Sequence, residues 1–169
     1  FMAACTKLAA FGVILRLTFV GVGANRWDWQ GGLYVVAVLT MVVGAVLSVT
    51  QTDVKRLLAY SSIAHAGFIL VGVLAFSQAA IGGVMFYLVA YAITNFGAWS
   101  VVIALEKQEG RGLAIEDYAG LGRKHPALAA AMTVFMLSLV GFPPTLGLVG
   151  KFYLFRAVLE GGLTWLAII

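Results

Sequence analysis

Residues 51–76 read QTDVKRLLAYSSIAHAGFILVGVLAF, in which three charges precede a long apolar run. The part from Leu57 to Phe76 is long enough, at about 1.5 Å per residue, to cross a hydrocarbon core of about 30 Å as a helix. The stretch therefore predicts a transmembrane helix. His65 lies nine residues beyond Arg56, so it falls about 14 Å into that core, close to its midplane.

The composition extends this interpretation to the whole chain. Of its 169 residues, 62% are hydrophobic and 11% are charged, whereas a soluble domain has about 25% charged residues. Lipid offers the backbone no hydrogen bonds, so spanning segments are helices or closed barrels, and the alternating strands of a barrel are not found. We therefore predict an all-α polytopic membrane protein. The net charge of +4 falls mostly in expected loops and indicates topology rather than nucleic-acid binding.

Five apolar stretches and the start of a sixth predict the transmembrane helices of one continuous unit, residues 1–169. The expected spans are residues 1–22, 33–50, 57–76, 84–105 and 127–159, followed by the start of a further span at 163–169. The fifth is too long for one straight crossing. Pro143 and Pro144 predict a break within it, because consecutive prolines remove two amide donors. Both ends of the sequence lie in apolar runs without a signal-peptide pattern, so we expect a fragment of a longer membrane protein.

The connections between these spans are expected to be short, except for a polar loop at residues 106–126. Residues 23–32 are predicted to form a loop with interfacial tryptophans, residues 77–83 a short turn, and residues 115–121 a short interfacial helix. The loops after the second and fourth spans carry six basic residues, against Arg26 alone in the others: Lys55, Arg56, Lys107, Arg111, Arg123 and Lys124. This bias predicts that the polar loop faces the cytoplasm.

Three titratable side chains at membrane depth are candidates for proton transfer: Lys7, His65 and Lys151. Ionisable residues inside a span are costly and usually functional. Histidine exchanges protons near neutral pH, desolvation favours the neutral form of a buried amine, and broken helices gather ion sites in transporters. The alternatives are structural. His65 would only donate a hydrogen bond that packs helices together. Lys7 would snorkel to the surface, and Lys151 with Arg156 would mark the end of a span.

Other polar residues are placed to support these three. Ser61 and Ser62 lie four and three residues before His65, on the same helix face. A further stripe on the fourth span, Tyr87, Tyr91 and Asn95 with Thr94 beside it, should face the helix bundle rather than lipid. Ordinary hydrogen bonding between helices and the lining of a hydrated path both remain open for this stripe.

The sequence contains no phosphate-binding loop, no Cys/His metal spacing and no nucleophile motif, and its single cysteine, Cys5, excludes a disulfide framework. We therefore expect no cofactor and no metal on this chain. Any catalysis is expected to be transport.

Four stretches resemble a known family. Residues 51–68, QTDVKRLLAYSSIAHAGF, resemble the signature of the antiporter-like, proton-pumping membrane subunits of complex I, and residues 136–155, MLSLVGFPPTLGLVGKFYLF, resemble their broken helix. Residues 5–17, CTKLAAFGVILRL, and 115–130, IEDYAGLGRKHPALAA, resemble more narrowly subunit N of NADH-quinone oxidoreductase. The resemblance covers almost the entire chain.

The resemblance implies a fold of two inverted five-helix repeats, each with one broken helix, of which this chain is a part. It implies that Lys7, His65 and Lys151 belong to a lateral chain of protonatable groups, driven by quinone reduction elsewhere. The implied partners are other membrane subunits of complex I and the lipid bilayer, in a bacterial plasma membrane, with NADH and quinone used by the whole complex. The alternatives are a subunit of a multi-subunit cation/proton antiporter, a membrane subunit of an energy-converting hydrogenase, or a non-catalytic membrane scaffold.

Overall fold

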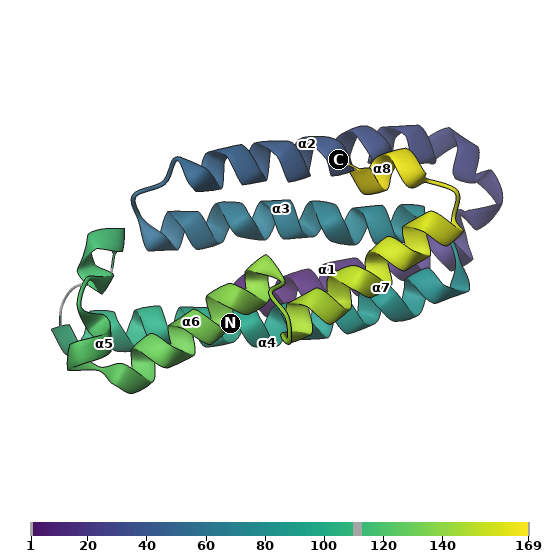
Figure 1. The fold of residues 1–169 in the computed structure, drawn as a ribbon. Helices are drawn as coiled ribbons and strands as arrows, with labels where there is room; N and C mark the ends of the chain where they lie inside the picture. The colour runs from purple at the N-terminus through teal and green to yellow at the C-terminus, as the bar shows by residue number, and fades with distance from the viewer. Residues whose placement is uncertain (1, 110–112, 169) are drawn as a thin grey trace.

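The computed structural model describes residues 2–109 and 113–168, and within these ranges all regular elements are helices. They are α1 (Met2–Arg16), η1 (Leu17–Gly21), η2 (Gly23–Asn25), α2 (Arg26–Val49), α3 (Val54–Leu74), α4 (Gln78–Glu109), η3 (Ile115–Tyr118), α5 (Leu121–Lys124), α6 (Pro126–Val140), α7 (Leu146–Glu160) and α8 (Thr164–Ile168), as Figure 1 shows. The predicted all-α class is confirmed. The long helices run side by side. Each one satisfies its own backbone hydrogen bonds, as a transmembrane segment must.

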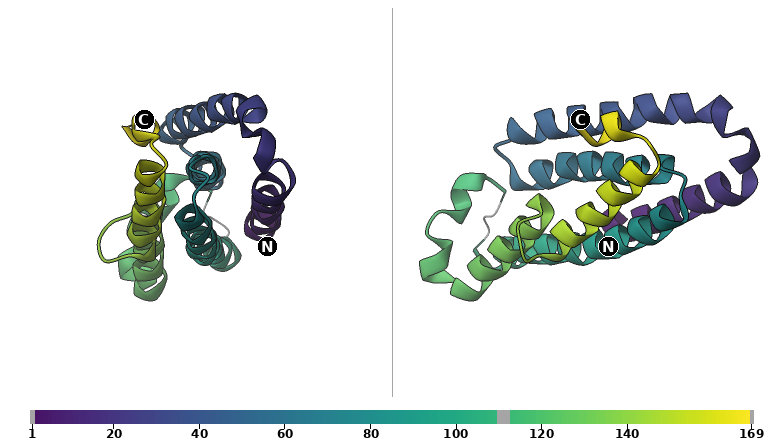
Figure 2. Two further views of the ribbon diagram at one scale, coloured as in Figure 1. Left: turned by 90° about the vertical axis from the view of Figure 1, so that its right-hand side faces the viewer. Right: turned by 45° about the vertical axis from the view of Figure 1, so that its right-hand side comes forward.

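The helices form a layered bundle with α3 and α4 at its centre. In the end-on view of Figure 2, α1 lies on one side of α4, α6 and α7 lie on the other side, and α2 packs mainly on α3. Accordingly 56% of the apolar stretch is buried in each of α3 and α4, against 17% in α2. Side chains on α3 and α4 are therefore the ones that this chain can hold away from lipid.

Three helices in the described part of the chain are long and apolar enough to cross a membrane alone: Gly23–Val49, Val54–Leu74 and Gln78–Lys107. The two halves α6 and α7 have 15 residues each, so each reaches about 22 Å and together they make one interrupted crossing. The predicted break is confirmed. Gly141 ends α6 with φ 88°, a left-handed conformation that suits glycine, and α7 begins at Leu146.

Two connections differ from the prediction. Residues 26–32, expected in a loop, form the first two turns of α2, where the Trp29 indole donates to the carbonyl of Val22 at 3.1 Å. Residues 78–83, expected in a turn, already belong to α4, whose first turn is capped by the Ser77 hydroxyl accepting from the Ala80 amide at 3.1 Å. Tryptophan and glycine are typical of membrane interfaces, but neither prevents a helix from continuing through the interface.

The polar loop is held against the start of α3. Asp53 caps α3 by accepting from the amides of Lys55 and Arg56 at 2.8 and 3.1 Å, and it pairs with Ala114 in an isolated antiparallel bridge. The short helix expected over residues 115–121 is instead the 3₁₀ turn η3 and a separate α5. Asp53 thus has a structural role at this end of the bundle, as the N-cap of α3.

Glycines allow α2 and α3 to approach closely. A Cβ atom on Gly44 would lie 2.6 Å from the backbone nitrogen of Ala64, and one on Gly67 would lie 3.0 Å from the carbonyl oxygen of Ala37. Small residues at such crossings are typical of membrane helices, which associate by close packing rather than by the hydrophobic effect. By contrast, a Cβ on Gly31, on the same helix α2, would meet no atom within 4 Å.

The substitution Gly44→Leu is expected to destabilise the full-length protein, because the side chain would be forced into the backbone of α3. The cost should be about 1–3 kcal/mol, as for overpacked cores, and it would lower the midpoint of thermal unfolding measured in detergent. Gly31→Leu is the matched control and should leave the midpoint unchanged. Equal midpoints for the two variants would contradict the α2–α3 contact.

Candidate functional site

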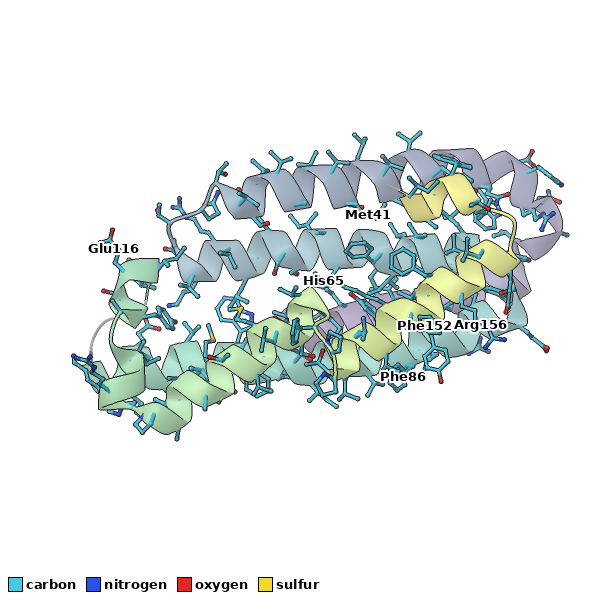
Figure 3. The ribbon with its side chains drawn as sticks, in the orientation of Figure 1. Met41, His65, Phe86, Glu116, Phe152 and Arg156 are labelled. Carbon is cyan, nitrogen blue, oxygen red and sulfur yellow. The ribbon has the colours of Figure 1, made fainter. Side chains whose placement is uncertain are left out.

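His65 lies on α3 near the middle of the bundle (Figure 3), and most of the other titratable and polar residues singled out in the sequence lie close to it. The His65 side chain is only 7% exposed. Its Nδ1 lies 2.5 Å from the hydroxyl oxygen of Tyr87 on α4, and its ring centroid lies 5.2 Å from that of Tyr91, one turn further along α4. Two polar residues spaced four apart on α4 thus face one histidine on α3.

Lys7 approaches this group from α1. Its ammonium donates to the carbonyl oxygen of Ser62 at 2.6 Å and also to the Ser62 hydroxyl. The same nitrogen lies 5.6 Å from the centroid of the Tyr91 ring, at the distance of a cation–π contact. The Tyr91 ring therefore contacts both Lys7 and His65. Lys7 does not reach out to the surface as the snorkelling alternative requires.

Lys151 approaches from the opposite side, on α7. Its ammonium donates to the carbonyl oxygens of Val140 and Leu139 at 2.8 and 3.2 Å. These carbonyls belong to the last turn of α6, where the helix break leaves them without amide partners, and where the helix dipole favours a cation. The nitrogen also lies 5.3 Å from the centroid of Phe68, whose ring is 6.0 Å from that of His65.

A pair of hydroxyls links the centre of the bundle to the helix break. Thr94 on α4 donates to the carbonyl of Ala90 at 2.7 Å, and its oxygen lies 3.2 Å from the hydroxyl oxygen of Ser138 on α6. Since the Thr94 proton is engaged, Ser138 is the donor in that pair. Sequence reasoning noted Thr94 but missed Ser138, whose only signal was a serine in a largely apolar half-helix shortly before the proline pair.

A small cavity lies between the histidine and this hydroxyl pair. It measures about 10 Å³ and is lined by His65, Tyr87, Tyr91, Thr94, Ser138 and Gly147, among others, and such a volume is about what one water molecule needs. Gly147 is required here because a Cβ atom would overlap the carbonyl oxygen of Ser138. A second cavity of about 20 Å³ adjoins Lys151.

Two buried polar atoms lack a hydrogen-bond partner among the described residues, the Tyr91 hydroxyl and the Asn95 side-chain nitrogen. Both come from the polar stripe on α4, and Asn95 is only 1% exposed. A buried donor left unpaired costs about 1–3 kcal/mol, and buried water is the usual partner for such groups. Their burial within this chain means that the stripe faces the bundle interior, as the sequence predicts.

One predicted supporting residue stays outside the group. The Ser61 hydroxyl donates to the carbonyl of Leu58 on its own helix at 2.9 Å, so only Ser62 of the two serines contacts another member. The described residues also contain no group of three His, Cys, Asp or Glu side chains placed to hold a metal ion. The group thus has one imidazole bonded to a phenol, one amine bonded to Ser62 and a second amine bonded to the carbonyls of α6.

Comparison with known proteins identifies the family of the chain. Residues 1–169 match the family described as NADH:quinone oxidoreductase/Mrp antiporter, transmembrane. Proteins named NADH-quinone oxidoreductase subunit N are similar over nearly the whole chain. The one from Saccharopolyspora erythraea is 46% identical over 100% of this chain and 33% of its own length. The one from Salinispora arenicola is 51% identical over 99% of this chain and 32% of its own length. The one from Trichlorobacter lovleyi is 48% identical over 100% of this chain and 35% of its own length.

The chain thus spans about a third of the length of the curated relatives it matches. Apolar helices of spanning length and the matched transmembrane family together make it an integral membrane protein. It belongs to the NADH:quinone oxidoreductase/Mrp antiporter transmembrane family.

Proposed function

We propose that this chain is part of a membrane subunit of NADH-quinone oxidoreductase, of the subunit N type, and that it relays protons laterally through Lys7, His65 and Lys151. The subunit assignment is supported by the names of relatives about 50% identical to it. The relay is supported by one observation above all. Two amines from opposite sides of the bundle approach a single buried histidine, each beside an aromatic ring that also lies next to the imidazole: Tyr91 for Lys7 and Phe68 for Lys151.

The histidine and Tyr87 form the central switch of this relay. When His65 is neutral, its Nδ1 accepts the Tyr87 hydroxyl proton; when it is protonated, the same nitrogen donates to the phenol oxygen instead. The hydrogen bond therefore persists in both states while its direction reverses. Because charges in a low-dielectric interior interact strongly, protonation of one member disfavours protonation of the next, so that charge moves stepwise.

The route from His65 to Lys151 runs through oxygens at the helix break. The Thr94 and Ser138 hydroxyls and the cavity beside them lie on α4 and α6, and a water there would extend the chain of hydrogen bonds toward the last carbonyls of α6. Those carbonyls hold the Lys151 ammonium. Lys151 is charged while it bonds them and neutral after it releases a proton, so it is the exchange point of the relay.

The redox chemistry lies elsewhere in this proposal. NADH oxidation and quinone reduction are carried out by other subunits, and this chain contributes only the transfer of protons across the membrane. Its partners are the neighbouring membrane subunits and the lipid bilayer. Proton release is expected on the side opposite the basic loop at residues 106–126, which the charge bias places at the cytoplasm.

The subunit assignment is tested with the full-length parent protein, tagged, gently solubilised and run on a native gel stained for NADH dehydrogenase activity. Comigration with the active band is expected. Migration in a band without that activity would contradict the assignment. Cation exchange by vesicles containing that band would then establish the antiporter alternative.

Replacing Lys151 separates a proton carrier from a structural cation. Both Lys151→Ala and Lys151→Arg in the full-length subunit are expected to lower proton translocation per NADH oxidised. The level should equal that of a complex in which this subunit transfers no protons. Arginine keeps the positive charge on the α6 carbonyls but does not release its proton, since its pKa exceeds about 12. The measurement is dye-reported acidification of membrane vesicles during NADH oxidation. Normal translocation by Lys151→Arg would contradict a relay through this side chain.

Replacing His65 separates the relay from a scaffold. His65→Gln keeps a hydrogen-bonding partner for Tyr87 but cannot carry a proton, so translocation should fall as far as in Lys151→Arg while the thermal midpoint changes little. The control is Thr40→Val on α2, whose hydroxyl bonds only the carbonyls of Val36 and Ala37 on its own helix. Full translocation by His65→Gln would favour the scaffold interpretation.

A further inference from the structure

A groove on the exposed side of α4 and α7 lies apart from the proton-transfer group. It has a volume of about 510 Å³, and its lining includes Gly82, Gly83, Phe86, Val149, Tyr153 and Arg156. This volume is in the range of about 300–1,000 Å³ found for small-molecule sites. Figure 3 shows Phe86 and Arg156 on this side of the bundle, with Arg156 toward the end where α7 finishes.

We propose that this groove binds one phospholipid with an anionic headgroup, its acyl chain against the apolar lining and its phosphate on Arg156. The inference does not depend on the proposed proton relay. It requires that the chain lies in a membrane, which its helices and family establish, and that this face of α4 and α7 is open to lipid in the full-length subunit.

The order of residues along the groove matches the order of groups in a lipid. Arg156 lies one turn before the end of α7 at Glu160, which is the level at which a helix enters the headgroup region. Val149 lies seven residues earlier and therefore about 10 Å deeper. Tyr153 lies between them, as expected of an aromatic residue at the boundary between hydrocarbon and headgroups. The cation at one end of the groove thus faces the lipid phosphate, and the apolar floor beyond it faces the acyl chain.

Two glycines lower the floor of the groove. A Cβ on Gly82 would meet no atom within 4 Å, so this position opens directly into the space, while a Cβ on Gly83 would lie 3.3 Å from the carbonyl oxygen of Tyr153. Phe86 and Tyr153 form the wall, with ring centroids 5.7 Å apart in an edge-on arrangement. A slot with a smooth floor and one aromatic wall fits an extended hydrocarbon chain.

Arg156 is oriented with most of its donors available. Its Nε donates to Glu160 at 2.8 Å, and its side chain is 66% exposed. A guanidinium carries five N–H donors in a planar fork, and the pair with Glu160 uses the one at Nε. The two terminal nitrogens can bind phosphate oxygens in the bidentate manner typical of arginine. These free donors therefore match a lipid phosphate at the rim, beside the Glu160 carboxylate.

The test uses the full-length subunit in its native complex, in membranes supplied with phosphatidylglycerol that carries a diazirine in its acyl chain. After illumination and digestion, labelled peptides are identified by mass spectrometry. We expect label on the segments of α4 and α7 that line the groove. Gly82→Leu places a side chain in the groove, with room for its Cβ atom, and should reduce that label about fivefold or more. Gly31→Leu, equally open but on α2, is the matched control and should not.

The headgroup is tested with a second pair of variants. Arg156→Gln should reduce labelling by phosphatidylglycerol about fivefold, the effect of one basic residue near anionic lipid, and should leave labelling by the matching phosphatidylcholine probe unchanged. Arg26→Gln, at the same end of the bundle but on α2, should change neither. Equal labelling of wild type by the two probes would overturn the anionic specificity. Absence of label in the groove, or a crosslink from a photoreactive residue at position 86 to another protein segment, would overturn the lipid.

Discussion

The structure depends on one constraint, that a backbone polar group inside a membrane must find a partner within the protein. Continuous helices meet it along α2, α3 and α4, and the break at Pro143 and Pro144 violates it. There the last carbonyls of α6 lose their amide donors, and the Lys151 ammonium replaces two of them. The break thus determines where a cation can be held at depth, and the cation in turn makes the break tolerable.

The same constraint explains why the polar groups form one set. An isolated lysine or histidine in lipid is costly, but each group here is stabilised by a hydrogen bond or a ring contact with a neighbour. Lys7 bonds Ser62 and His65 bonds Tyr87, while the Tyr91 ring lies between Lys7 and the imidazole. Groups that satisfy one another in this way are also close enough to exchange protons, so the packing requirement and the proposed function call for the same geometry.

Hydropathy predicted the helices and the proline pair predicted the break, because both follow from the order of residues along one segment. The approach of Lys7 to Ser62 and the meeting of Thr94 with Ser138 could not be derived in this way. They depend on which faces of α1, α4 and α6 oppose one another, which side-chain spacing within a helix does not specify. The starts of α2 and α4 were misplaced for a different reason. Interfacial tryptophan, serine and glycine resemble loop residues in composition but act here as first-turn residues and caps.

Lys151 and Arg156 illustrate how far local context separates two cations on one helix. They are five residues apart on α7, so they project about 140° from each other. The sequence alone allowed both to be read as markers of the end of a span. Lys151 instead points inward to the carbonyls of α6, half-buried beside Phe68, whereas Arg156 is exposed and paired with Glu160. An ammonium that can lose its proton occupies the interior, and a guanidinium that cannot lies where lipid phosphate would be. The rotation between the two positions thus puts Lys151 in the interior and Arg156 at the surface, and the chemistry of each side chain suits its environment.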